Sequence, residues 1–522
     1  MTIDPVHYQR RWKTLAVLAL SLLIIGLDNT ILNVALPSLQ EEFDASSSTL
    51  QWIVDSYLLS FAGLLHTMGT LGDRFGRKLA LQLGLVLFGG ASLLALWVES
   101  SDQLIAIRAM MGVGGALIMP ATLSILSNVF PREERGKAIG IWAGMASVGI
   151  GLGPLTGGVL LEYFDWSSVF LVNVPVAAAA FLAGSWLVPE SRDPKPGAFD
   201  LPGATLSISA LVTLVYAIVE APERGWTDPR VLACFGAAAA FALAFIRWEL
   251  RTPDPMLNLS FFRNPRFSIA SMGISLAFFS LFGSIFALTQ FLQDAKGYSA
   301  LEAGAAMVPL AFGLVAGSIS SIKLVARVGT TKVVTFGLLN MAALLAVSLM
   351  WSEDMAYWPL GVWFLGAALS MGWIMGPATE SVMGAVPEEK SGVASAMNDV
   401  TRQVGGALGT AIIGSLISTI YGNKIADSVA SLPDAAREAA EDSIGKANTV
   451  AQSLPAADGA RVGDAAADAF TQALGIGFTV AAACALLAAI VVKLRLPPRH
   501  TAQAHDVVVE LPGKAGPERM AA

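Results

Sequence analysis

Long uninterrupted apolar runs constrain the fold of this chain more than any other feature of its sequence. Many runs are close to 20 residues long, which is what a helix rising 1.5 Å per residue needs to cross a bilayer core about 30 Å thick. Of the 522 residues, 54% are hydrophobic and only 14% are charged, whereas about 25% are charged in average soluble proteins. The sequence therefore predicts an all-α polytopic membrane protein and excludes an ordinary soluble domain.

Fourteen runs meet this length requirement and predict fourteen transmembrane helices. The first follows a basic stretch as in a signal peptide, but it is too long for one, so we interpret it as a retained helix. The spans are predicted at 14–36, 49–71, 79–98, 103–128, 137–162, 169–188, 202–220, 229–250, 267–293, 302–326, 333–351, 358–384, 393–420 and 473–495. The predicted domains are a tail (1–13), a six-helix bundle (14–188), two inserted helices with flanking loops (189–266), a second six-helix bundle (267–495) and a tail (496–522).

The basic residues predict the orientation of these spans. Most of the 33 Lys and Arg residues lie in the two tails and the even-numbered loops, and basic loops stay in the cytoplasm. We therefore expect cytoplasmic termini in a bacterial-type cell membrane. The acidic, Ala-rich segment 421–472 is then an external loop, expected to be partly helical or disordered, and we assign it no chemistry. A net charge of −7 argues against a nucleic-acid partner.

The loop after the second run reads GTLGDRFGRK and combines glycines with one acidic and three basic residues. Its glycines permit a tight turn, and its aspartate is expected where the next helix begins, near that helix's positive end. A basic loop that only fixes topology is the alternative. The loop resembles the signature loop of the major facilitator superfamily, which implies a role in holding helices together in the outward-facing state. Its residues are Gly69, Gly72, Asp73, Arg74, Gly76, Arg77 and Lys78.

The fifth run reads GIGLGPLTGG. Gly149, Gly153 and Gly157 recur every four residues, so they form a smooth helix face that lets another backbone approach, and Pro154 can bend the helix. Generic packing of small residues is the alternative. With Gly158, the segment resembles the antiporter motif of proton-coupled exporters in the same superfamily.

Two further segments, LDNTILNVALP from Leu27 and LIAIRAMMGVGGA from Leu104, extend the resemblance. Together with fourteen spans they resemble the drug:proton antiporter branch of the superfamily, over nearly the whole chain. Two departures occur: Met111 stands where glutamine is common, and residues 165–168 read DWSS where an aromatic–basic pair is common. The resemblance implies a monomer that exports drugs without a cofactor, using protons as the coupling ion.

An internal repeat is also expected. If spans 9–14 repeat spans 1–6, the loop containing Arg327, Gly329 and Lys332 echoes the signature loop, and Gly405 and Gly409 echo the glycine spacing of the fifth span. Spans seven and eight are then an insertion between two related bundles.

Three charged residues lie well inside the predicted spans of the first bundle, away from the ends of the runs. Asp28, Asp55 and Arg108 are all expected in the outer half of the membrane, roughly 8–13 Å from its outer side at 1.5 Å per residue. Charges at such depth are costly and mark function by default, so we expect Arg108 to hold one carboxylate ionised while burial favours the neutral form of the other. Alternatively, Asp28 bonds to backbone at a kink, Asp55 faces interfacial water, and Arg108 is a structural cation.

Span thirteen of the second bundle holds Asp399 and Arg402 three residues apart, on one helix face. They are either a self-satisfied ion pair or part of a second coupling or substrate site. Glu380 lies near the inner end of span twelve and is either part of that site or interfacial.

The predicted function is proton-coupled export of lipophilic, cationic drugs or dyes by alternating access. No Gly-Lys pair has the flanking residues of a phosphate-binding loop, so the energy must come from an ion gradient. Alternatives are a same-fold exporter or importer of a specific metabolite and a membrane-embedded enzyme. The four histidines cannot form the zinc motif HExxH.

Overall fold

The computed structural model describes residues 5–192, 200–253, 255, 257, 259–386 and 391–496, and these residues form helices joined by short connections. The predicted C-terminal tail therefore lies almost wholly outside the described residues. The helices are α1 (Pro5–Phe43), α2 (Ser47–Phe75), α3 (Arg77–Leu94), α4 (Ser101–Val129), α5 (Arg132–Tyr163), α6 (Ser168–Leu171), α7 (Asn173–Leu187), α8 (Leu201–Arg224), α9 (Pro229–Glu249), α10 (Pro265–Gln290), α11 (Ala300–Ala306), α12 (Val308–Val328), α13 (Thr330–Val347), α14 (Tyr357–Met383), α15 (Ser391–Val429), α16 (Asp434–Asp442), α17 (Ile444–Ser453) and α18 (Ala456–Arg495). Short 3-10 or π turns continue some of them, such as Phe291–Ala295 after α10.

Thirteen helical segments in the described residues are long and apolar enough to cross a membrane. The prediction of an all-helical membrane fold is thus confirmed. The second predicted span, which corresponds to α2, is not among the thirteen. This helix carries Gln51, Asp55 and His66, and more than half of its residues are buried against other helices, so a polar composition is tolerated there.

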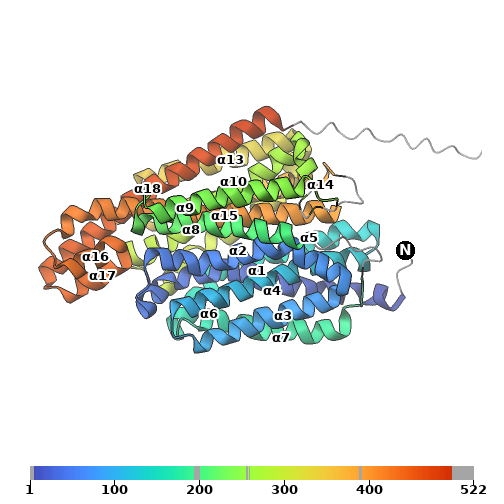
Figure 1. The fold of residues 1–522 in the computed structure, drawn as a ribbon, viewed down its shortest axis with the longest axis horizontal. Coiled ribbons are helices and arrows are strands. Elements are labelled where there is room, and N and C mark those ends of the chain that lie inside the picture. The colour runs from blue at the N-terminus through green and yellow to red at the C-terminus, as the bar shows by residue number, and fades with distance from the viewer. Residues whose placement is uncertain are drawn as a thin grey trace, which may run out of the picture.

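The helices pack in two sets (Figure 1). In the N-terminal set, α1 packs against α5 and α7, α2 against α4, and α3 against α4 and α7. In the C-terminal set, α10 packs against α15, α14 and α18, while α13 packs against α14 and α18, and α12 against α14. Helices α8 and α9 form a hairpin, and α8 lies against α2 and α15.

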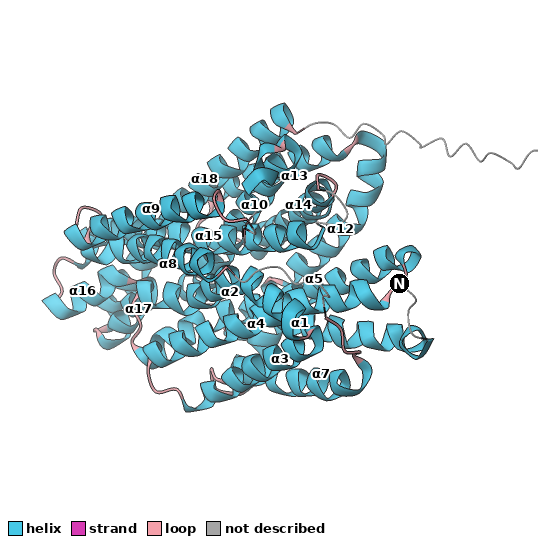
Figure 2. Cartoon of the chain, turned by 45° about the vertical axis from the view of Figure 1, so that its right-hand side comes forward, coloured by secondary structure: helices cyan, strands magenta, loops and turns pink. Residues whose placement is uncertain are grey.

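The molecule has two distinct ends. We call the end with the chain's N-terminus the terminal end, and the end with α16 and α17 the cap end (Figure 1). The two sets lie close together near α16 and α17 and spread apart toward the terminal end (Figure 2). In agreement, Gln293 donates to the Val34 carbonyl at 2.9 Å, which joins the cap ends of α10 and α1.

The segment 421–472 is helical almost throughout. Helix α15 continues to Val429, α18 begins at Ala456, and the short helices α16 and α17 lie between them. We call α16 and α17, residues 434–453, the cap. Disorder was one expectation for this segment; the structure instead describes a small helical body.

Candidate functional site

A buried ion pair joins α1 to α4 in the N-terminal set. Arg108 Nη1 lies 2.6 Å from Asp28 Oδ2, and the two side chains are 2% and 1% exposed. Breaking a buried pair by removing one partner typically costs about 3–5 kcal/mol, because an uncompensated charge remains. The structure thus brings together two of the three charged residues that the sequence singled out in this bundle.

Arg108 also contacts α2. Its Nε donates to the Ile53 carbonyl at 3.2 Å, and its guanidinium carbon lies 4.4 Å from the centre of the Tyr57 ring. Tyr57 is fully buried, and a desolvated cation over an aromatic face is stabilised by the ring quadrupole. One side chain of α4 therefore ties α1 and α2 into a single unit.

A second polar group completes the environment of Asp28. Asn173, at the start of α7, lies with its amide nitrogen 3.3 Å from Asp28 Oδ1 and 3.4 Å from the Ser92 hydroxyl. Ser92 in turn lies 3.8 Å from the sulfur of Met111. The sequence reasoning did not select Asn173; its signal was an amide within the apolar stretch LVNVPV.

Asp55 lies on a different side of α2. It is two residues from both Ile53 and Tyr57, and at 3.6 residues per turn this turns its side chain to roughly the opposite face from Arg108. Its neighbour one turn earlier, Gln51, packs on Gly414 of α15. The side chain of Asp55 is fully buried, and neither carboxyl oxygen has a hydrogen-bond partner among the described residues. The structure therefore separates Asp55 from the pair of Asp28 and Arg108.

Asp399 and Arg402 of α15 form their own pair. Arg402 Nη1 lies 3.3 Å from Asp399 Oδ1, and Nη2 donates to the Thr379 hydroxyl of α14 at 2.7 Å. The guanidinium carbon of Arg402 also lies 5.8 Å from the ring centre of Phe278 on α10. Glu380 is exposed near the terminal end of α14.

The glycines of α5 lie against α1. A side chain at Gly149 would meet the Leu23 carbonyl at 2.5 Å, and one at Gly153 would meet the Leu27 carbonyl at 2.9 Å. Gly157 lies against Ile31 in the same way, at 3.0 Å. Pro154 is inside the helix, which continues through it.

A second glycine face of α5 meets the C-terminal set. A side chain at Gly158 would lie 2.5 Å from the Ala300 carbonyl, and the Pro154 carbonyl closely approaches Gly304 of α11. Gly151 packs on Ala311 of α12, where an added side chain would lie 2.6 Å away. The antiporter-like segment thus packs on α1 with one face and on the other set of helices with another.

The signature-like loop differs in detail from the sequence expectation. Helix α2 continues to Phe75, so Asp73 lies in its last turn and not where the next helix begins. Asp73 accepts a hydrogen bond from Arg77 Nε at 2.7 Å. Only Gly76, with φ of 131°, makes the turn, since Gly69 and Gly72 are helical.

The three basic residues of this loop differ in their contacts. Lys78 donates to the Ser185 carbonyl of α7 at 2.8 Å, and the Arg77 amide donates to the Ser191 carbonyl at 3.0 Å. Arg74 is exposed. The loop therefore ties the terminal ends of α2, α3 and α7 together within one set.

Apolar membrane-length helices with charged pairs buried among them define a multi-pass membrane protein. In the described residues no group of three or more His, Cys, Asp or Glu side chains is placed to hold a metal ion. Residues 18–410 match the family model described as Major Facilitator Superfamily. The chain belongs to this superfamily, and it is therefore a secondary transporter and not an enzyme.

Similar proteins span nearly the whole chain. It is 36% identical over 490 residues to the multidrug efflux pump LfrA of Mycolicibacterium smegmatis, covering 92% of this chain and 96% of that protein. It is 34% identical to the tetracenomycin C resistance and export protein of Streptomyces glaucescens, with 92% and 91% covered. It is 35% identical to the methyl viologen resistance protein SmvA of Salmonella typhimurium, with 92% and 97% covered.

Solved structures with the same fold include a bacterial homologue of the human lysosomal transporter Spinster in an inward-facing, unoccupied conformation. The TM-score is 0.62 at 19% identity, covering 94% of this chain and 98% of that chain. An inward-open structure of the xylose transporter XylE from E. coli gives a TM-score of 0.58 at 14% identity, with 94% and 98% covered. At these identities the likeness concerns the fold alone.

Proposed function

We propose that this chain is a proton-coupled antiporter that exports lipophilic, cationic drugs or dyes across the bacterial cytoplasmic membrane by alternating access. The names of its relatives support drug export, since three of them are called an efflux pump, a resistance and export protein, and a resistance protein. Methyl viologen, in the name of one relative, is an organic dication, which favours a cationic substrate class.

The proposed topology has fourteen spans with both termini in the cytoplasm. Helix α2 is the fourteenth span, because its 29 residues reach about 43 Å at 1.5 Å per residue and it packs side by side with α4. The basic Arg77 and Lys78 then lie on the cytoplasmic side, which makes the terminal end cytoplasmic and the cap end external.

The proposed layout is two related six-helix bundles with α8 and α9 inserted between them. Gly329 between α12 and α13 has φ of 89°, matching the positive φ of Gly76 between α2 and α3. Gly405 and Gly409 pack on the backbone of α10, as Gly149 and Gly153 pack on α1. These matching features support an internal repeat of the kind found in such carriers.

The proposed proton coupling rests on Asp55, whose carboxyl group is buried without a hydrogen-bond partner among the described residues. A carboxylate buried without hydrogen bonds is far costlier than a neutral carboxyl, so this arrangement suits the protonated form. Its helix lies against α15, across the contact between the two sets of helices. Opening the cap end would part α2 from α15 and expose Asp55 to external water, where it exchanges protons.

Asp28 has the second role in this mechanism. In the present arrangement Arg108 forms an ion pair with Asp28 at 2.6 Å. A lipophilic cation that approaches Asp28 competes with Arg108 for it, and the Tyr57 ring offers an adjacent aromatic surface. Asp399 with Arg402 forms a corresponding pair in the other bundle.

Transport into liposomes tests this proposal. Purified protein is reconstituted, a pH gradient is imposed, and uptake of methyl viologen is followed with wild type, Asp55→Asn and Asp28→Asn. We expect uptake only with the gradient and loss of gradient-driven uptake in Asp55→Asn. Equal uptake with and without a gradient would exclude antiport, and gradient-driven transport of a nutrient but not of methyl viologen would favour a metabolite carrier.

A further inference from the structure

The cap is fixed to the C-terminal set of helices. Helices α15 and α18 have 39 and 40 residues, about 60 Å each at 1.5 Å per residue, so they project well past a bilayer core of about 30 Å and carry the cap on their ends. The Tyr421 hydroxyl of α15 donates to the Ala440 carbonyl at 2.9 Å, and Asn448 donates to the Asp294 carbonyl beyond α10 at 2.9 Å. The cap therefore moves with this set.

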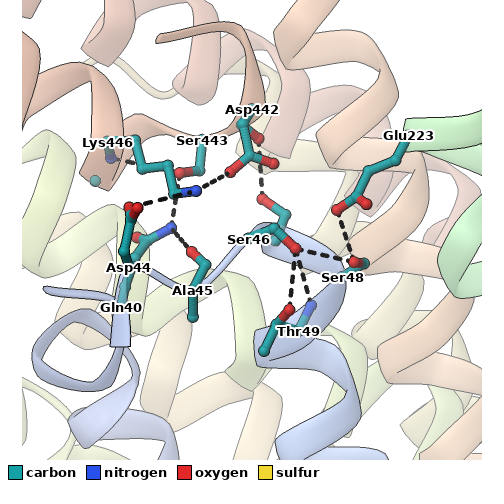
Figure 3. Close-up of polar contacts among 12 residues, drawn as sticks. Gln40, Asp44, Ala45, Ser46, Ser48, Thr49, Glu223, Asp442, Ser443 and Lys446 are labelled. Carbon is teal, nitrogen blue, oxygen red and sulfur yellow. Dashed lines mark hydrogen bonds and ion pairs between the residues drawn. The ribbon is translucent and has the colours of Figure 1, made fainter. Parts of the chain in front are cut away.

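The same cap contacts the turn between α1 and α2 of the other set (Figure 3). Gln40 Nε2 donates to the Ser443 hydroxyl at 2.7 Å, and the Ser47 hydroxyl donates to the Asp442 carbonyl at 3.0 Å. Lys446 Nζ lies 3.5 Å from Asp44 Oδ1. Three contacts thus cross between the two sets at one place.

The backbone of the turn is shaped for this contact. Asp44 has φ of 46°, in the left-handed region that aspartate tolerates better than most residues. The sharp turn sets Gln40, at the end of α1, and Ser47, at the start of α2, against the cap. Ser48 next to it donates to Glu223 of α8 at 2.6 Å, so the inserted hairpin is held at the same turn (Figure 3).

The contacts differ in strength. Asp44 is 92% exposed, so its pair with Lys446 is screened by water and contributes little. Gln40 and Ser443 are 4% and 3% exposed, and a buried donor left without its acceptor is costly. Ser443 also caps the first turn of α17, where its hydroxyl accepts from the Lys446 amide at 3.4 Å. The bond between Gln40 and Ser443 therefore joins α1 directly to the helix start in the cap.

We propose that the cap is a latch: it is carried by the C-terminal set, grips the turn between α1 and α2, and holds the cap end closed. Alternating access requires these contacts to break each time the cap end opens, so the latch shifts the ratio of open to closed molecules toward the closed arrangement. This inference rests on the alternating access of the proposed function, but not on protons or on the substrate.

Gly445 offers a selective way to weaken the latch. The three atoms nearest to a side chain added there all belong to Gln40, so Gly445→Ala displaces Gln40. The hydrogen bonds that anchor the cap, from Tyr421 to Ala440 and from Asn448 to Asp294, involve other residues. Alanine is also a better helix former than glycine, which leaves α17 intact. Gly463 on α18 is the matched control, because nothing lies within 4 Å of a side chain added there. Gln40→Ala is a second, independent latch variant.

Spin labels at Glu162→Cys and Ser352→Cys, both exposed and on opposite sets, report the opening of the cap end by pulsed distance measurement. Cys234 and Cys484 are replaced by alanine in this background. Without drug or pH gradient, we expect the ratio of open to closed molecules to rise about tenfold in Gly445→Ala and Gln40→Ala, and to stay unchanged in Gly463→Ala.

If Gly445→Ala and Gln40→Ala both gave the same distance distribution as the control, the proposal that the cap is a latch would be refuted. That result would leave proton coupling untouched, since the measurement involves neither protons nor substrate. Conversely, an increased open fraction in a protein that transports without a pH gradient would keep the latch and refute the antiport mechanism.

Discussion

Gly158 on α5 provides the sharpest test of how the cap end closes. In Gly158→Ala, the new Cβ would lie 2.5 Å from the Ala300 carbonyl oxygen, about 0.9 Å inside the ordinary contact range that begins at 3.4 Å. The clashing atoms belong to the backbone of the opposite set, so they cannot rotate away, and α5 and α11 must separate. Overpacking of this kind costs about 1–3 kcal/mol.

This cost applies to the closed arrangement alone, because the contact joins the two sets. At 1.4 kcal/mol per tenfold change, the ratio of open to closed molecules is expected to rise about 5- to 150-fold. The matched control is Gly144→Ala on the same helix, where nothing lies within 4 Å of an added side chain.

The assay is the pulsed distance measurement between labels at positions 162 and 352. Gly158→Ala should show a larger long-distance population than wild type, and Gly144→Ala should match wild type. An unchanged distribution in Gly158→Ala would mean that α5 and α11 do not form the closing contact.

Two further predictions concern charged groups. Arg108→Met should lower the free energy of unfolding of the purified protein by about 3–5 kcal/mol, because Asp28 would keep a buried charge without a partner. The double variant with Asp28→Leu should recover part of this loss. Equal stability of wild type and Arg108→Met in a thermal unfolding assay would contradict a contribution of the ion pair. Burial raises the pKa of Asp442, with Glu223 adding to the rise and Lys446 opposing it. Opening the cap end would return the pKa of Asp442 toward its ordinary value near 4, so Asp442 takes up a proton when the cap end closes. This proton stabilises the closed arrangement relative to the open one. The stabilisation is complete below about pH 4 and is lost as the pH rises through the raised pKa of the closed arrangement. The open fraction from the spin labels should therefore grow from pH 4.5 to pH 8, and Asp442→Asn should remove this dependence; a dependence that persists in Asp442→Asn would assign it to another group.

The sequence predicted the helices well because a lipid environment leaves few choices. Every unpaired backbone group is costly in a bilayer, so a long apolar run must become a helix. The apolar run at 49–71 predicts α2 as a span, but α2 is not among the helical segments long and apolar enough to cross a membrane. More than half of its residues are buried against other helices, which tolerates its polar side chains. Helix ends were harder to predict: α15 and α18 continue far past the apolar runs, since alanine-rich segments remain helical in water when they pack on each other.

The depth of a charged residue along its helix could be predicted from the sequence, but the direction in which its side chain points around the helix could not. Asp28, Asp55 and Arg108 were expected at a similar depth, and two of them form a pair. Asp55 faces the other side of α2, which only the packing of α4 and α15 around that helix determines. The latch was not predicted, because Gln40 and Ser443 are ordinary polar residues that are 403 positions apart.

The most direct test of the central proposal is proton release on substrate binding. Methyl viologen is added to purified protein in weakly buffered detergent solution, and the pH change is recorded for wild type, Asp55→Asn and Asp28→Asn, with binding measured separately. Wild type should release on the order of one proton per bound dication, since a protonated Asp55 is the only neutral carboxyl the mechanism requires. Asp55→Asn should bind without releasing a proton. Full proton release in Asp55→Asn would contradict the role assigned to Asp55.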